Sequence, residues 1–185
     1  MLEFIADMPA QTQERIICSI SAAAKYEIPA NIVLAVAEKE GGKPGQWVRN
    51  SNGTHDVGSM QINTSYLKDL AQYGITADDV AVSGCYPYDL AAWRLRMHII
   101  RDKGDIWTKS ANYHSKTPKY NSIYRADLIV KAEKWADWLE SRFPAESVLQ
   151  SDVVQLNYKS ETPAKMPTNQ QRANNYIPRQ ITFRN

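Results

Sequence analysis

The chain has 185 residues with 22 Lys and Arg against 20 Asp and Glu, so its formal net charge is only +2. Hydrophobic residues make up 43% of the chain, which is enough for one packed core with an appendage. The sequence has no basic block of the kind that binds nucleic acid, no segment of transmembrane length and no metal-ligand spacing. We therefore expect no nucleic acid partner, no membrane span, no metal and no cofactor.

The N-terminal segment MLEFIADMPAQTQ has neither the basic region nor the apolar run of a signal peptide. We expect that any export depends on a leader removed beforehand or on another route. The first predicted helix covers residues 12–26, where Ile16, Ile17 and Ile20 recur at helical spacing. It contains Cys18, and Pro29 separates it from the next helix.

The next predicted helix, residues 31–40, is apolar along most of its length. Asn31 is its expected N-cap, and a pair of glycines follows its last residue, Glu40. Glu40 continues the apolar stripe at the negative end of the helix dipole, so burial and the dipole should both raise its pKa. Glu38 has equivalent spacing to earlier apolar residues, so spacing alone does not choose between the two acids.

A turn-rich loop follows this helix. Residues 50–54 are Asn, Ser, Asn, Gly and Thr, and the segment from Asp56 to Ile62 alternates imperfectly, which predicts a small β-hairpin. The hairpin would form one wall of a cleft and bring a second carboxyl, Asp56, near the helix end. Cleavage of a glycosidic bond requires one carboxyl that holds a proton near neutral pH, often with a second that stays ionised.

The sequence from Glu40 to Asn63, EGGKPGQWVRNSNGTHDVGSMQIN, resembles that of the lysozyme-like lytic transglycosylases. In that family a glutamate before a small residue and a glycine is followed by N-S-N-G-T-x-D-x-G-x-M-Q-I-N. The stretch is also similar to its counterpart in animal C-type lysozymes. The resemblance assigns the catalytic acid to Glu40 and marks Asp56 as the second catalytic carboxyl. It also implies a substrate-binding role in the cleft or hairpin for Gly58, Met60, Gln61 and Asn63.

A second segment of the family, an aromatic-rich helix with a tyrosine near the cleaved bond, matches S-A-N-Y-H-S at residues 110–115. The resemblance therefore assigns Tyr113 to substrate binding, although an ordinary half-buried tyrosine is the alternative. We assign no role to His114. Many members read A-Y-N-A-G here, whereas A-N-Y-H-S-K-T-P is similar to the subgroup that serves conjugation, type IV secretion and pilus systems.

The chain has two cysteines, and composition alone is compatible with two reduced, buried thiols. Secretion-associated members of the family carry one cysteine in the first helix and another in a turn before the next long helix. Cys18 and Cys85 match those places. The resemblance thus implies a disulfide between them, which in turn implies an oxidising compartment, the periplasm.

The remaining predicted elements are helical. They cover residues 65–73, 77–82, 89–102 and about 121–143. In the last of these, Trp135 and Trp138 are interpreted as packing residues. Trp47 and Trp107 lie nearer the motif segments, which makes them the better candidates for stacking on sugar rings.

The character of the chain changes after Pro144. Residues 144–185 have scattered Pro, Asn and Gln, little periodicity and few large apolar residues, which is typical of an extended, partly disordered tail. We expect one domain at 1–143 and a tail at 144–185 that docks on the domain or binds a component of a secretion or conjugation system.

The fold expected from these elements is mainly α (α+β), lysozyme-like, with a small β-hairpin beside the cleft. The resemblance implies a peptidoglycan lytic transglycosylase that cleaves the β-1,4 bond between N-acetylmuramic acid (MurNAc) and N-acetylglucosamine (GlcNAc) without water, leaving 1,6-anhydroMurNAc ends. Its substrate would be the glycan strands of peptidoglycan. A hydrolytic muramidase that uses Asp56 and a non-catalytic, wall-binding scaffold are the alternatives.

Overall fold

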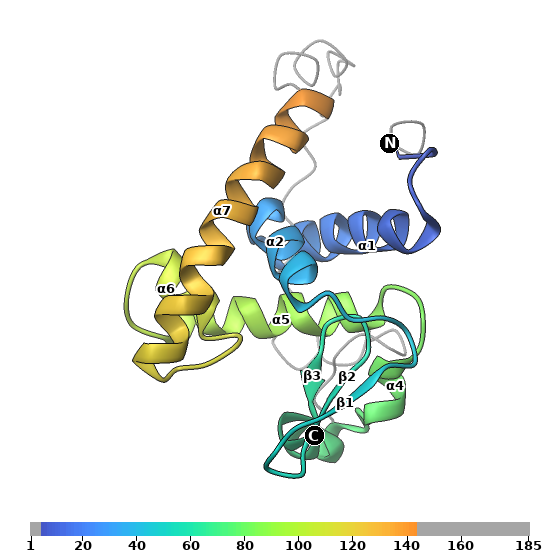
Figure 1. The fold of residues 1–185 in the computed structure, drawn as a ribbon, viewed down its shortest axis with the longest axis vertical. Coiled ribbons are helices and arrows are strands. Elements are labelled where there is room, and N and C mark those ends of the chain that lie inside the picture. The colour runs from blue at the N-terminus through green and yellow to red at the C-terminus, as the bar shows by residue number, and fades with distance from the viewer. Residues whose placement is uncertain (1–4, 144–185) are drawn as a thin grey trace, which may run out of the picture.

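The structure is a computed structural model that describes residues 5–143. The predicted tail, residues 144–185, and the domain boundary before it lie outside the described residues. Figure 1 shows helices α1 and α2 on one side of α5 and the small sheet with α4 on the other side, while α7 runs past the end of α5 beside α6. Within the described part of the chain, no helix is both long and apolar enough to cross a membrane.

The first two helices are α1 (Ala10–Tyr26) and α2 (Ala30–Glu40), and a proline precedes each of them. The expectation that Asn31 caps α2 is wrong. The helix already begins at Ala30, because Pro29 has the fixed φ that suits a helix start, and no side chain caps it. The Asn31 amide instead donates a hydrogen bond to the carbonyl of Ala132 at 3.2 Å, joining α2 to α7.

Helix α2 lies at the centre of the fold (Figure 1). All six residues from Ile32 to Ala37 are buried, which is typical of a helix that is covered on every side. It packs against α1 and against the long helix α7 (Pro118–Arg142). Its C-terminal end is therefore fixed on two sides, and this end carries the acid that the sequence singles out.

The predicted hairpin is part of a three-stranded antiparallel sheet in the order β1-β2-β3. Its strands are β1 (Trp47–Arg49), β2 (His55–Val57) and β3 (Ile62–Asn63). The register pairs Trp47 with Val57, and it pairs Asp56 with Asn63 on the neighbouring strand. The sheet thus places the second carboxyl at a defined position in its middle strand.

Five further elements link the sheet to α7. They are α3 (Thr64–Leu70), the short 3-10 helix η2 (Ala71–Tyr73), α4 (Ala77–Ala81), α5 (Tyr86–Arg101) and α6 (Ile106–Ala111). The predicted helices at 65–73, 77–82, 89–102 and 121–143 are confirmed, with shifted ends. Helix α5 begins three residues early because Pro87 suits the first turn of a helix. The resulting fold is the expected mainly α, lysozyme-like architecture with a small sheet.

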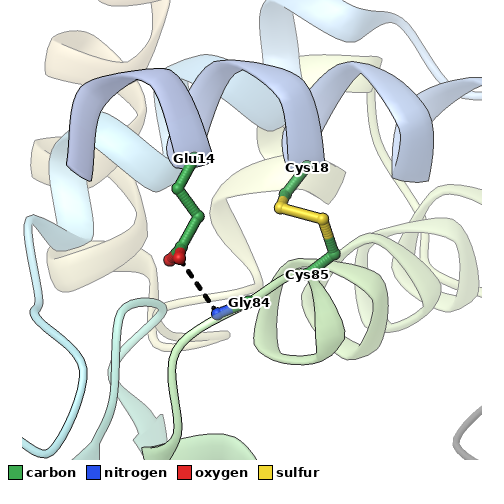
Figure 2. The surroundings of a disulfide bond; sticks show 4 residues. All are labelled: Glu14, Cys18, Gly84 and Cys85. Carbon is green, nitrogen blue, oxygen red and sulfur yellow. Dashed lines mark hydrogen bonds between the residues drawn. A yellow bond between two sulfur atoms is a disulfide. The ribbon is translucent and has the colours of Figure 1, made fainter. Parts of the chain in front are cut away.

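A disulfide joins Cys18 of α1 to Cys85 at the start of α5 (Figure 2). One helical turn earlier on α1, the Glu14 carboxylate accepts a hydrogen bond from the backbone N–H of Gly84 at 3.0 Å. Both side chains point toward the same short segment before α5. The segment between α4 and α5 is thereby tied to α1 by one covalent bond and one hydrogen bond.

Candidate active site

Glu40 is the last residue of α2, and Gly41 ends the helix in the left-handed conformation, with φ +59°. The Glu40 side chain is half-buried. Its Oε1 accepts a hydrogen bond of 2.6 Å from the hydroxyl of Tyr124 on α7. A short bond of this kind to a carboxylate is charge-assisted and fixes the position of the carboxyl group.

Glu38, the acid that spacing could not exclude, has a different environment. Its Oε2 accepts a hydrogen bond of 2.7 Å from the indole N–H of Trp135, and its Oε1 lies 3.2 Å from the Nζ of Lys134. Both partners belong to α7. Glu38 is therefore engaged in holding α2 to α7, which leaves Glu40 as the candidate acid.

The environment of Glu40 raises its pKa from 4.5 to about 7. Burial is the largest cause, because it disfavours the charged form, and the negative charge of Asp56 acts in the same direction. The hydrogen bond from Tyr124 and the positive charges of Arg94 and Lys39 oppose this rise. The result is a carboxyl that is partly protonated at neutral pH, as a general acid requires.

Glu40 opens into a pocket of about 290 Å³ between the end of α2, the segment after α6 and the start of α7. One wall is apolar and exposed, because the side chains of Tyr120 and Ile123 on α7 are 53% and 63% exposed. The complete lining consists of Lys39, Glu40, His114, Tyr120, Ile123 and Tyr124.

Tyr124 is a residue of the candidate site that the sequence analysis missed. It is only 3% exposed, and the ring of His114 stacks on its ring at 4.9 Å with an interplanar angle of 6°. Burial, together with the nearby Glu40 carboxylate, raises the pKa of Tyr124 well above its usual value, so its hydroxyl remains a donor. No motif identified it, because it is one of ten tyrosines and lies 84 residues from its partner.

Tyr113, assigned to substrate binding by resemblance, is 3% exposed. Its hydroxyl donates a hydrogen bond of 2.9 Å to the backbone carbonyl of Met60, and burial raises its pKa. The side chain of Met60 itself is fully buried in the core. In this structure both residues tie the segment after α6 to the turn before β3, and neither side chain presents an open contact surface.

Asp56 lies on β2 and is half-buried. Its Oδ1 accepts a hydrogen bond of 2.7 Å from the side-chain amide of Asn63, whose own carbonyl oxygen caps α3 by accepting from the N–H of Ser65. The same amide also donates to Thr54 at 3.0 Å. The Asn63 side chain therefore connects three segments, and it fixes the Asp56 carboxylate relative to the sheet and to α3.

Gly58 and Gln61 shape the turn between β2 and β3. Gly58 has φ +70°, and a Cβ there would overlap the carbonyl oxygen of Val80 on α4, so only glycine fits. Gln61 also has a positive φ of 46°, and its side-chain amide donates to the carbonyl of Gly58 at 2.9 Å. The Gln61 side chain is thus used within the turn, close to Gly42 just beyond Glu40.

The tryptophans agree in part with the predicted division into packing residues and candidates for stacking on sugar rings. Trp135 is 8% exposed and bonds to Glu38, as expected of a packing residue. Trp47 is 46% exposed and meets the edge of the His55 ring at 6.0 Å, whereas Trp107 is half-buried against the core. In residues 5–143, no group of three His, Cys, Asp or Glu side chains is placed to hold a metal ion.

Comparisons with known proteins place the chain among relatives. No protein-family model matches it. Invasion protein IagB of Salmonella typhimurium strain SL1344 is 28% identical over 108 residues, which are 57% of this chain and 67% of IagB. Protein IpgF of Shigella flexneri is 32% identical over 126 residues, which are 63% of this chain and 82% of IpgF. An IpgF from Shigella sonnei matches to the same extent. The chain belongs to the family of the Shigella flexneri protein IpgF.

Proposed function

We propose that this protein is a peptidoglycan lytic transglycosylase with Glu40 as its acid and base. One observation carries the proposal. The Glu40 carboxyl lines a pocket, and its pKa is raised to about 7. The lysozyme-like architecture and the motif from Glu40 to Asn63 support the same reaction class. A strongly perturbed carboxyl in a pocket is the pattern expected of a catalytic acid.

In the first step, protonated Glu40 donates its proton to the glycosidic oxygen between MurNAc and GlcNAc. The bond from that oxygen to the anomeric carbon breaks, and GlcNAc leaves with a free 4-hydroxyl. Positive charge develops on the MurNAc ring, and the fixed Asp56 carboxylate is suited to stabilise it.

In the second step, the Glu40 carboxylate removes the proton from the 6-hydroxyl of the same MurNAc. The freed oxygen attacks the anomeric carbon and closes the 1,6-anhydro ring. Glu40 ends the cycle protonated, and no water is consumed. Tyr124 donates to Oε1 of Glu40, so it stabilises the carboxylate between the two steps and holds it in one orientation.

A hydrolytic muramidase is the second candidate, and Asp56 is the observation that favours it. Its carboxylate is close enough to contribute to the raised pKa of Glu40, as a second carboxyl in a hydrolase site would be. In that reaction a water would replace the 6-hydroxyl, and the product would carry a reducing end. A wall-binding scaffold without activity is the alternative that an inactive wild type would favour.

The proposed role is to open the cell wall locally for a secretion or conjugation apparatus. The relative IagB is named an invasion protein, which is compatible with such a role for this chain. The disulfide supports a periplasmic location, because disulfides persist in oxidising compartments. Partner binding through residues 144–185 is part of the proposal and lies outside the described residues.

Release of soluble fragments from purified peptidoglycan tests the proposal, with Glu38→Gln as the matched control for Glu40→Gln. Both changes remove one carboxylate charge near the end of α2. We expect Glu40→Gln to lower the rate by about a hundredfold or more, as the loss of a general acid does. Glu38→Gln should retain most of the activity. Equal activity of Glu40→Gln and wild type would refute the enzyme assignment.

A further inference from the structure

Arg94 is a half-buried residue of α5 whose guanidinium carbon lies over two tyrosine rings. It is 4.5 Å from the ring centroid of Tyr66 and 4.7 Å from that of Tyr113. Cation–π contacts of this kind hold the guanidinium in place through its charge. They do not use its five N–H groups, which are its hydrogen-bond donors.

Within residues 5–143, no hydrogen bond or ion pair joins these donors to an acceptor, and the direct contacts of the Arg94 guanidinium are the two ring contacts. Two other arginines differ in this respect. Arg96, two residues later on α5, donates to the carbonyl of Glu27 at 3.1 Å, and Arg125 donates to the hydroxyl of Thr108 at 2.7 Å. The Arg94 guanidinium is thus held in place by two rings, while its N–H donors bind no acceptor in the described residues.

Arg94 also belongs to the surroundings of the catalytic acid. Its positive charge opposes the rise of the Glu40 pKa, and after burial it contributes to the lowered pKa of His114. Both of these residues line the same pocket. Lys39, the second cation whose charge acts on Glu40, lines that pocket and is already paired with Asp127 at 2.7 Å. Of these two cations, Arg94 is therefore the one whose donors are free for a ligand.

We infer that Arg94 binds a carboxylate of the glycan substrate, and this inference rests on the proposed function. MurNAc differs from GlcNAc by a lactyl ether that ends in a carboxyl group. In a bare glycan strand that lactyl carboxylate is free, whereas in a peptide-bearing strand it is amidated and the stem peptide supplies carboxylates instead. A planar guanidinium matches either carboxylate with two parallel N–H bonds. Arg94 thereby selects strands that contain MurNAc over uncharged polymers of GlcNAc.

The experiment measures equilibrium binding by calorimetry in full-length Glu40→Gln protein, which holds the glycan without cleaving it. The three ligands are a GlcNAc tetrasaccharide, a MurNAc-containing tetrasaccharide without peptides, and the same tetrasaccharide with its stems. Arg94→Gln and Arg94→Lys are compared with the matched control Arg96→Gln. Thermal unfolding of each variant establishes that it is folded.

We expect Arg94→Gln to weaken binding of a carboxylate-bearing ligand by about tenfold or more, with unchanged binding of the GlcNAc tetrasaccharide. Arg94→Lys should recover part of the loss, because it keeps the charge without the planar fork, and Arg96→Gln should bind as the parent does. A loss confined to the peptide-free ligand identifies the lactyl carboxylate, and one confined to the peptide-bearing ligand identifies the stem. A loss for both means that either carboxylate is accepted.

Two outcomes overturn the assignment of Arg94. One is unchanged binding of both MurNAc ligands in Arg94→Gln, and the other is an equal loss for the GlcNAc tetrasaccharide. Either result leaves the proposed function intact as long as wild-type protein cleaves peptidoglycan and Glu40→Gln does not. Failure of the Glu40→Gln protein to bind any of the three ligands contradicts both proposals.

Discussion

Replacement of Tyr124 by Phe should move the pH dependence of the reaction in a defined direction. The Tyr124 hydroxyl donates a 2.6 Å hydrogen bond to the Glu40 carboxylate and opposes the rise of its pKa to about 7. A hydrogen bond to a charged group contributes about 1.5 to 3 kcal/mol, and one pH unit corresponds to 1.36 kcal/mol. Loss of the hydroxyl should therefore raise the pKa of Glu40 by about one to two pH units.

The assay is kcat/KM against pH on purified peptidoglycan, because this profile reports ionisations of the free enzyme. Glu40 must be protonated to act as the acid, so its ionisation is the alkaline limb of the profile. In Tyr124→Phe that limb should move to higher pH, while the rate at the optimum falls because the carboxylate intermediate is less stable. Tyr120→Phe is the control, since Tyr120 lines the same pocket and has no hydrogen bond to Glu40. An alkaline limb that stays in place, or moves equally in both variants, refutes the role given to Tyr124.

Three further predictions concern stability. Glu40→Gln should stabilise the protein above pH 7 by about 3 kcal/mol at most, and not below pH 4, in denaturant titrations at several pH values. The folded pKa of about 7 exceeds the unfolded value of 4.5, so wild type loses stability as pH rises through that window and Gln does not. An equal effect at both pH values would contradict the raised pKa. Replacing both Cys18 and Cys85 by Ser should cost about 4 kcal/mol, because the bond closes a loop with a sequence separation of 67. Reduced wild type should match this variant, and free thiols in oxidised wild type would contradict the bond. Gly58→Ala should lower the midpoint of thermal unfolding more than Gly53→Ala, because both have positive φ and only the Cβ at Gly58 meets a backbone carbonyl. Equal losses would contradict the close packing at Gly58.

The helix that ends at Glu40 could be predicted because its signals are local. An apolar run ended by glycine sets the C-terminal end of α2 at the acid in both the sequence and the structure. The predicted start of α2 was wrong, because Asn31 lies inside the first turn and its side chain donates a hydrogen bond to α7. Local preference for an N-cap was overridden by the proline before it and by a partner far along the chain.

The rest of the site depends on contacts between distant segments. Tyr124 reaches Glu40 from α7, and Trp135 reaches Glu38 from the same helix, so the choice between the two acids is made by α7. Strand β1 was missed because all three of its residues are exposed, so its sequence, Trp-Val-Arg, does not alternate between apolar and polar residues as a half-buried strand does. Arg94 likewise looks like any charged residue of an amphipathic helix until the fold places two tyrosine rings against it.

Mass spectrometry of muropeptides released in water enriched in heavy oxygen tests the central claim most directly. Wild-type protein should release 1,6-anhydroMurNAc ends that contain no heavy oxygen, and Glu40→Gln should release none. This result would establish intramolecular attack with Glu40 as the acid and base. Reducing ends that carry heavy oxygen would contradict the account and favour the hydrolytic alternative, in which Asp56 is the proposed second catalytic carboxyl.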